Sequence, residues 1–118
     1  MSYCELVEIN DTLLKKSMVQ SDIDEGTAYV DAVVQGFGVT LKTPVPYEIK
    51  QLAISYACMR RALYLSAKPV QSDVDAYELK RKAYAKDVQE WESKLTIELL
   101  TGGKQQPKSY FNMTMKRN

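Results

Sequence analysis

Residues 41–64 read LKTPVPYEIKQLAISYACMRRALY, and no other part of the sequence constrains the architecture as strongly. Pro44 and Pro46 keep the residues before them out of the helical region, so 38–46 is predicted to be an extended linker. After the second proline, a stripe of mostly apolar side chains recurs at spacings of three and four: Ile49, Leu52, Ala53, Tyr56, Ala57, Arg60, Leu63 and Tyr64. This period predicts a helix with one face in a core, which ends at Pro69.

A second helix is predicted before the linker. Asp22 or Asp24 is suited to begin it, because a side-chain oxygen there accepts hydrogen bonds from free backbone N–H groups. Its apolar side chains again repeat at three and four: Tyr29, Val30, Val33, Val34 and Phe37. Gly36 and Gly38 then end it. Residues 1–20 are weakly patterned, and Asp11 is predicted to cap a short helix that carries Leu13, Leu14 and Met18.

A long helix is predicted after the core helix. Its inward positions alternate by three and four, as Val74, Tyr77, Arg81, Tyr84, Val88, Trp91 and Leu95. It can run to Leu100, where Gly102 and Gly103 supply a left-handed end. Residues 73–100 would span roughly 42 Å at ~1.5 Å per residue, whereas a compact domain of this length is only about 35 Å across. Three alternatives follow: the helix breaks, the molecule is elongated, or another subunit covers part of the helix.

The end of the chain differs in character from the rest. Residues 104–118 read KQQPKSYFNMTMKRN, with four basic and no acidic side chains. Phe111, Met113 and Met115 alternate with polar residues, which is the period of a strand with one apolar face. The segment is either a solubilising terminus or an arm that docks on a partner, and the exposed apolar alternation favours the arm. The predicted organisation is thus a helical domain, 1–103, followed by an extended basic arm, 104–118.

Composition excludes several function classes. The 118 residues suit one domain, and 45% hydrophobic residues with 26% charged residues are typical of a folded protein. The absence of histidine removes Ser-His-Asp and Cys-His nucleophiles and the H-E-x-x-H zinc helix. Cys4 and Cys58 are too far apart for a metal motif, and Cys58 is predicted to be a core residue. Asp22-x-Asp24-Glu25-Gly26 has the wrong spacing for a calcium loop. We therefore expect no enzyme, no bound metal and no cofactor.

The sequence has the features of a cytoplasmic protein, and its charge is distributed unevenly along the chain. No signal peptide is apparent, and no apolar run approaches the ~18 residues of a membrane span. The net charge is +1, yet residues 1–41 carry seven acidic and two basic side chains. This asymmetry suits molecules that meet a partner, or each other, in one orientation.

The two long helices would also form a basic surface if they pack antiparallel. Its candidate DNA-contact residues are Arg60, Arg61, Lys80, Arg81 and Lys82. Neighbouring acids favour the simpler interpretation, in which these side chains are solvated helix faces. A small helical DNA-binding or DNA-packaging accessory protein is nevertheless the alternative function.

The order of parts resembles that of the head–tail connector adaptor proteins of tailed bacteriophages. An acidic helix, Asp22–Gln35, precedes the extended GVTLKTPVP, and a helix opening Val45-Pro46-Tyr47-Glu48-Ile49-Lys50 follows it. A long charged helix and a tail complete the pattern, and the resemblance covers roughly residues 22–100. It implies an all-α bundle of three or four helices, with one long C-terminal helix and an extended C-terminal arm.

The resemblance also implies a structural role without an active site. Family members form a ring, usually of twelve copies, beneath the portal in the neck of the virion. Such a ring surrounds the DNA channel, joins the portal to a stopper or tail protein, and does not involve a membrane. C-terminal segments of the family commonly contact the portal. The residues expected to do so here are Lys104, Lys108, Tyr110, Phe111, Met113, Met115, Lys116 and Arg117.

Overall fold

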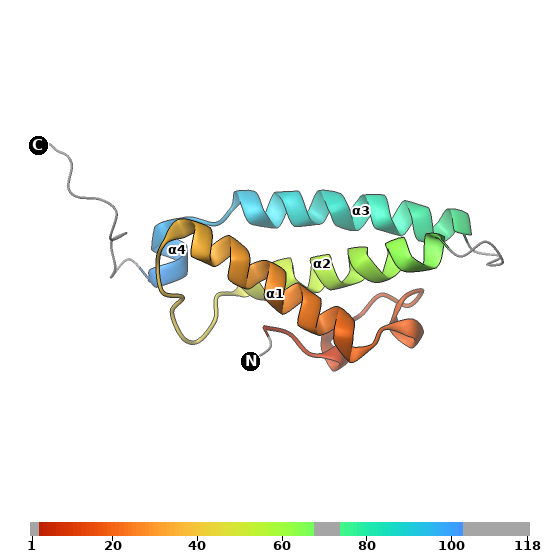
Figure 1. The fold of residues 1–118 in the computed structure, drawn as a ribbon, viewed down its shortest axis with the longest axis horizontal. Helices are drawn as coiled ribbons and strands as arrows, with labels where there is room; N and C mark the ends of the chain where they lie inside the picture. The colour runs from red at the N-terminus through yellow and green to blue at the C-terminus, as the bar shows by residue number, and fades with distance from the viewer. Residues whose placement is uncertain (1–2, 68–73, 103–118) are drawn as a thin grey trace, which may run out of the picture.

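Helix α2 (Tyr47–Ser66) is the central element of the fold. In the computed structural model, which describes residues 3–67 and 74–102, it packs against α1 (Gln20–Phe37) and antiparallel to α3 (Val74–Ser93) (Figure 1). A short α4 (Ile97–Thr101) follows. Single turns of 3₁₀ helix, Leu6–Glu8 and Lys15–Ser17, interrupt the N-terminal segment, and no strand occurs in the described ranges. The predicted all-α bundle is confirmed at this level.

Helix α1 ends at the predicted Gly38 but begins at Gln20, before the predicted Asp22 or Asp24. The Asp22 carboxylate accepts a hydrogen bond from the backbone N–H of Val19 at 3.0 Å, so it satisfies a free donor from inside the first turn. At the other end, Gly38 takes a left-handed conformation with φ 71°. Gly26 allows α1 to approach α2 closely, because a Cβ there would lie 2.7 Å from the Ala53 carbonyl oxygen.

Residues 38–46 form no helix, as the two prolines predict, but the linker is not extended throughout, because it bends at Val39 and again at Thr43 and Pro44. Pro46 stands immediately before the first turn of α2, where its lack of an N–H costs no helical hydrogen bond. The backbone N–H of Lys42 donates to the Leu100 carbonyl oxygen at 2.7 Å. This bond ties the linker to α4, so the linker belongs to the folded body.

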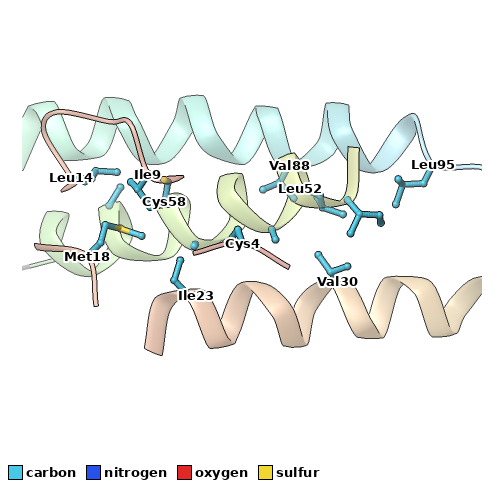
Figure 2. Packing of buried hydrophobic residues seen from close by; sticks show 14 of the residues in the cluster. Cys4, Ile9, Leu14, Met18, Ile23, Val30, Leu52, Cys58, Val88 and Leu95 are labelled. Atoms are coloured by element: carbon cyan, nitrogen blue, oxygen red, sulfur yellow. The ribbon is translucent and has the colours of Figure 1, made fainter. Parts of the chain in front are cut away.

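The core runs along α2 and includes the N-terminal segment (Figure 2). Ile9 and Leu14, from the weakly patterned residues 1–20, are fully buried. They join apolar side chains from every helix: Ile23, Val30, Ile49, Leu52, Cys58, Val88, Leu95 and Leu100. The prediction that Cys58 is a core residue is confirmed, and Leu14 and Met18 are buried as well.

The predicted apolar stripe of α2 is right in its first half and wrong in its second. Leu63 and Tyr64 are 53% and 52% exposed, while Ala62 and Leu65 are buried. The buried face there is displaced by about one residue, which is roughly 100° around a helix. The cause is that α1, α3 and the N-terminal segment contact α2 from different sides, so its buried face turns along its length.

The single long C-terminal helix is also a wrong prediction. Of the three alternatives, the break is observed: α3 ends at Ser93, and the Thr96 hydroxyl caps α4 by accepting from the Leu99 N–H at 3.1 Å. The break turns Leu95 into the core, where it is 6% exposed. The predicted left-handed end is confirmed at Gly102, whose φ is 72°.

Candidate functional site

The predicted portal-docking arm lies outside the described residues, so its role stays a prediction. The other candidate residues lie on α2 and α3, on the half of the bundle near the turn between these helices. There the structure places two buried carboxylates: Asp22, beside Arg60 and Arg61, and Asp11, beside Lys80.

Asp22 is a buried carboxylate between α1 and α2. It is 2% exposed, and its Oδ2 accepts from the Arg61 Nε–H at 2.9 Å. The Nε of Arg60 lies 3.9 Å from Oδ1. Both arginines are therefore directed toward an acid of the same chain, which compensates a charge that would be costly to bury alone.

Asp11 ties the N-terminal segment to α3. Its Oδ1 accepts from the backbone N–H groups of Leu13 and Leu14 at 2.9 and 3.0 Å, which is the capping interaction predicted for Asp11. The helix predicted to carry Leu13, Leu14 and Met18 is absent: residues 12–14 form a turn, and a single 3₁₀ turn, Lys15–Ser17, follows. Its Oδ2 accepts from the Tyr84 hydroxyl at 2.6 Å and from Lys80 at 2.9 Å. Burial opposes ionisation of this carboxyl, but the hydrogen bonds from Tyr84, Lys80 and the backbone outweigh it and lower its pKa.

The candidate DNA-contact residues are thus mostly engaged within the chain. Arg81 forms a two-point contact with Glu78, at 2.9 and 2.7 Å. Lys82 is exposed and has no ion pair with any described residue. Binding DNA through the rest of this surface would require breaking ion pairs, three of which involve the buried carboxylates of Asp22 and Asp11.

The cysteines have the properties of core residues. Burial raises the pKa of the Cys4 thiol to about 11 and that of Cys58 to about 12, so both are neutral near pH 7. A neutral buried thiol is a poor nucleophile and a poor metal ligand. Among residues 3–67 and 74–102, no three cysteine or carboxylate side chains gather closely enough to hold a metal ion.

A cavity of about 410 Å³ opens between the N-terminal segment, α2 and α3. Its walls carry the carboxylates Glu8, Asp11, Asp87 and Glu90, and the single lysine among its lining residues is Lys94. Uncharged groups complete the lining: Asn10, Gln51, Ile54, Ser55, Cys58, Tyr84 and Trp91. No local motif in the sequence indicates this cavity, because its walls come from three segments that are distant along the chain.

Large apolar side chains are exposed on several elements of the described part. Leu79 of α3 is 68% exposed, Tyr47 of α2 is 64% exposed and Val7 is 78% exposed. With Leu63 and Tyr64, they leave apolar surface on the outside of the bundle. Such surface is common on proteins that associate with other chains, although single exposed side chains also occur on monomers.

Comparison with known proteins identifies no relative. No family model matches the chain, no curated protein matches it, and no solved structure matches it. Within the part of the chain that the structure describes, none of the helices is both long and apolar enough to cross a membrane.

Proposed function

We propose that this chain is the ring-forming subunit of a head–tail connector, an adaptor of a tailed bacteriophage. The observation that supports the proposal most is the order of the elements: the acidic helix α1, a linker with two prolines, the core helix α2 and the charged helix α3. On this proposal, copies of the chain surround the DNA channel beneath the portal and present the far side of the ring to a stopper or tail protein. The arm 104–118 docks on the portal.

The charges on the two flanking helices support a head-to-tail arrangement of copies. Helix α1 carries exposed Asp24, Glu25 and Asp31 and has no basic residue. Helix α3 exposes Lys82 and Lys86. A ring brings two different patches together at each contact, so an acidic patch can meet a basic one in every repeat. The exposed Leu63, Tyr64 and Leu79 would supply apolar area.

Affinity purification from the native producing cells, followed by electron microscopy, tests the proposal. We expect rings of about twelve copies on a portal-like particle, as the family resemblance implies. Nucleic acid that copurifies without a ring or any virion component would contradict the adaptor and favour the DNA-binding alternative.

Charge reversal sharpens the test. The double variant Lys82→Glu/Lys86→Glu should remove the chain from such particles, and adding Asp24→Lys/Glu25→Lys should restore it. Lys15→Glu/Lys16→Glu, which changes exposed charges elsewhere on the molecule, serves as the control. Rings that persist in the first variant would disprove the α1–α3 contact without disproving the adaptor.

A further inference from the structure

The cavity between the N-terminal segment, α2 and α3 contains polar groups that the fold leaves unsatisfied. The Ser55 side chain lines the cavity, is 4% exposed, and makes no hydrogen bond to any described residue. Buried hydroxyl groups in folded proteins nearly always have a partner. Gln51, one turn earlier on the same wall, also has no side-chain partner among the described residues. The cavity therefore has the character of a binding site for a polar group.

The charge of the cavity indicates which kind of group it binds. Glu8 and Asp11 are neutralised by Lys50 and Lys80, at 2.5 and 2.9 Å. Asp87 and Glu90 also line the cavity, and neither forms an ion pair with a described residue. Two carboxylates on one wall and hydroxyl and amide oxygens on another are acceptors, so the missing ligand is a hydrogen-bond donor with a positive charge.

Aromatic and apolar groups in the lining favour a cation on an alkyl stem. Trp91 lines the cavity, and its ring already has the Lys94 ammonium 4.4 Å from its centroid. Ile54 and Trp91 offer apolar surface for methylene groups, while the carboxylates bind the charged end. Lysine and arginine side chains have this combination of stem and charge.

We propose that, in a chain that is not docked on a portal, this cavity binds a lysine or arginine side chain from residues 104–118 of the same chain. That segment has four basic and no acidic residues, which complements the unpaired Asp87 and Glu90. It begins just after α4, and only residues 94–96 separate α4 from the end of α3, which carries Trp91. Fifteen extended residues span about 50 Å, so the segment can reach the cavity. The covalent link also raises its effective concentration there.

Zero-length carbodiimide cross-linking of the full chain, read by mass spectrometry, tests this site. The reagent joins a lysine Nζ to a carboxyl group in direct contact through an amide bond, with loss of water. We expect Lys104, Lys108 or Lys116 to join to Asp87 or Glu90. The Lys50–Glu8 pair, at 2.5 Å, should cross-link in every sample and is the internal standard.

Matched variants and isotope mixing show which carboxylates the tail contacts and whether the contact forms within one chain. Asp87→Asn/Glu90→Gln should abolish the tail cross-links, whereas Asp24→Asn/Glu25→Gln, an exposed acid pair on α1, should leave them unchanged. In a mixture of ¹⁴N and ¹⁵N protein, the linked peptides should carry one isotope only. Tail lysines that join Asp24 or Glu25 equally well, or peptides of mixed isotope, would overturn the proposal. None of these results depends on ring formation.

Fluorescence of Trp91, the single tryptophan in the chain, gives a second readout on folded protein. Neutralising the tail, as Lys104→Gln/Lys108→Gln/Lys116→Gln/Arg117→Gln, should increase quenching of Trp91 by acrylamide because the cavity empties. Added 1,5-diaminopentane should reverse the increase. Quenching that is the same with and without the tail charges would overturn the proposal.

Discussion

The two ends of the bundle are held together by different chemistry. Helix α2 ends and α3 begins at the same end of the bundle (Figure 1). On this half, buried Asp22 and Asp11 accept hydrogen bonds from several elements. At the other end, Leu95 and Leu100 are buried, and one backbone bond joins the linker to α4. The carboxylate end thus depends on exact pairing of charges, and the apolar end on filled volume. The comparison predicts that the two ends respond differently to substitution and to pH.

The largest effect is expected from Asp22→Ala. It leaves Arg61, whose side chain is 14% exposed, without its partner, and it removes the cap on the Val19 N–H. Breaking a buried ion pair by removing one partner costs about 3–5 kcal/mol. Urea denaturation monitored by circular dichroism measures the loss.

The double variant Asp22→Ala/Arg61→Leu is the matched control for that loss. Removing both charges avoids a stranded arginine, so the double variant should be more stable than Asp22→Ala. A double variant that is less stable than Asp22→Ala would contradict this explanation. It would show that burial of the unpaired Arg61 charge does not cause the loss, and that the carboxylate end, like the apolar end, depends on filled volume.

Leu100→Ala tests the apolar end and ranks second. Leu100 is fully buried on α4, and truncating a buried leucine costs about 3 kcal/mol from lost burial and the residual cavity. The loss should be the same at pH 7 and pH 4, because no titrating group contacts this residue through a described hydrogen bond. Leu79→Ala, at a 68% exposed position of α3, is the control and should change the free energy of unfolding little.

Sequence reasoning succeeded where local rules decide the structure. Two prolines predicted the linker, and glycines predicted the left-handed ends at Gly38 and Gly102. It failed where contacts between distant segments decide. The helix breaks before Leu95 because this side chain packs into the core. Leu63 is exposed because three elements contact α2 from different sides, so the buried face of α2 changes along its length.

The candidate sites, too, were only partly predictable from the sequence. The basic residues of α2 and α3 and the neighbouring Glu78 could be found in the sequence, but the distant acidic partners Asp11 and Asp22 could not. Asp11 and Tyr84 are 73 positions apart, and Asp22 and Arg61 are 39 apart. The sequence does not single out Ser55, because α2 contains many small residues. Its unusual state, buried without a hydrogen bond to any described residue, exists only in the folded chain.

Acid sensitivity should be concentrated at the carboxylate end. Because the pKa of Asp11 is lower in the folded chain, its contribution to stability is complete above the unfolded value of about 4 and is lost as pH falls through the folded value. Asp11→Asn should cost about 2 kcal/mol at pH 7, as hydrogen bonds to a charged group do. It should also flatten the decline of stability between pH 5 and pH 2, an interval of about the width expected for one carboxyl group.

Part of the acid sensitivity should persist in Asp11→Asn. The Lys50 contact lowers the pKa of Glu8 in the same direction. Urea denaturation at several pH values measures how steeply the free energy of unfolding falls with pH in the unmodified chain and in Asp11→Asn. An unchanged slope in Asp11→Asn would assign the acid sensitivity to Glu8 and the surface carboxylates.

The smallest effects are expected from alanine substitutions at the ends of α1 and α4, where the two glycines have nearly identical backbone geometry. Gly38 ends α1 with φ 71° and Gly102 ends α4 with φ 72°, so alanine at either position incurs the left-handed penalty of about 1 kcal/mol. The surroundings differ. A Cβ at Gly38 would meet nothing within 4 Å, whereas a Cβ at Gly102 would lie 3.4 Å from the Lys42 side chain, beside the backbone bond from Lys42 to Leu100. Gly102→Ala should therefore match or slightly exceed Gly38→Ala in thermal melts. A markedly smaller loss at Gly102 would mean that α4 adds little to global stability and that the apolar end can open independently of the carboxylate end.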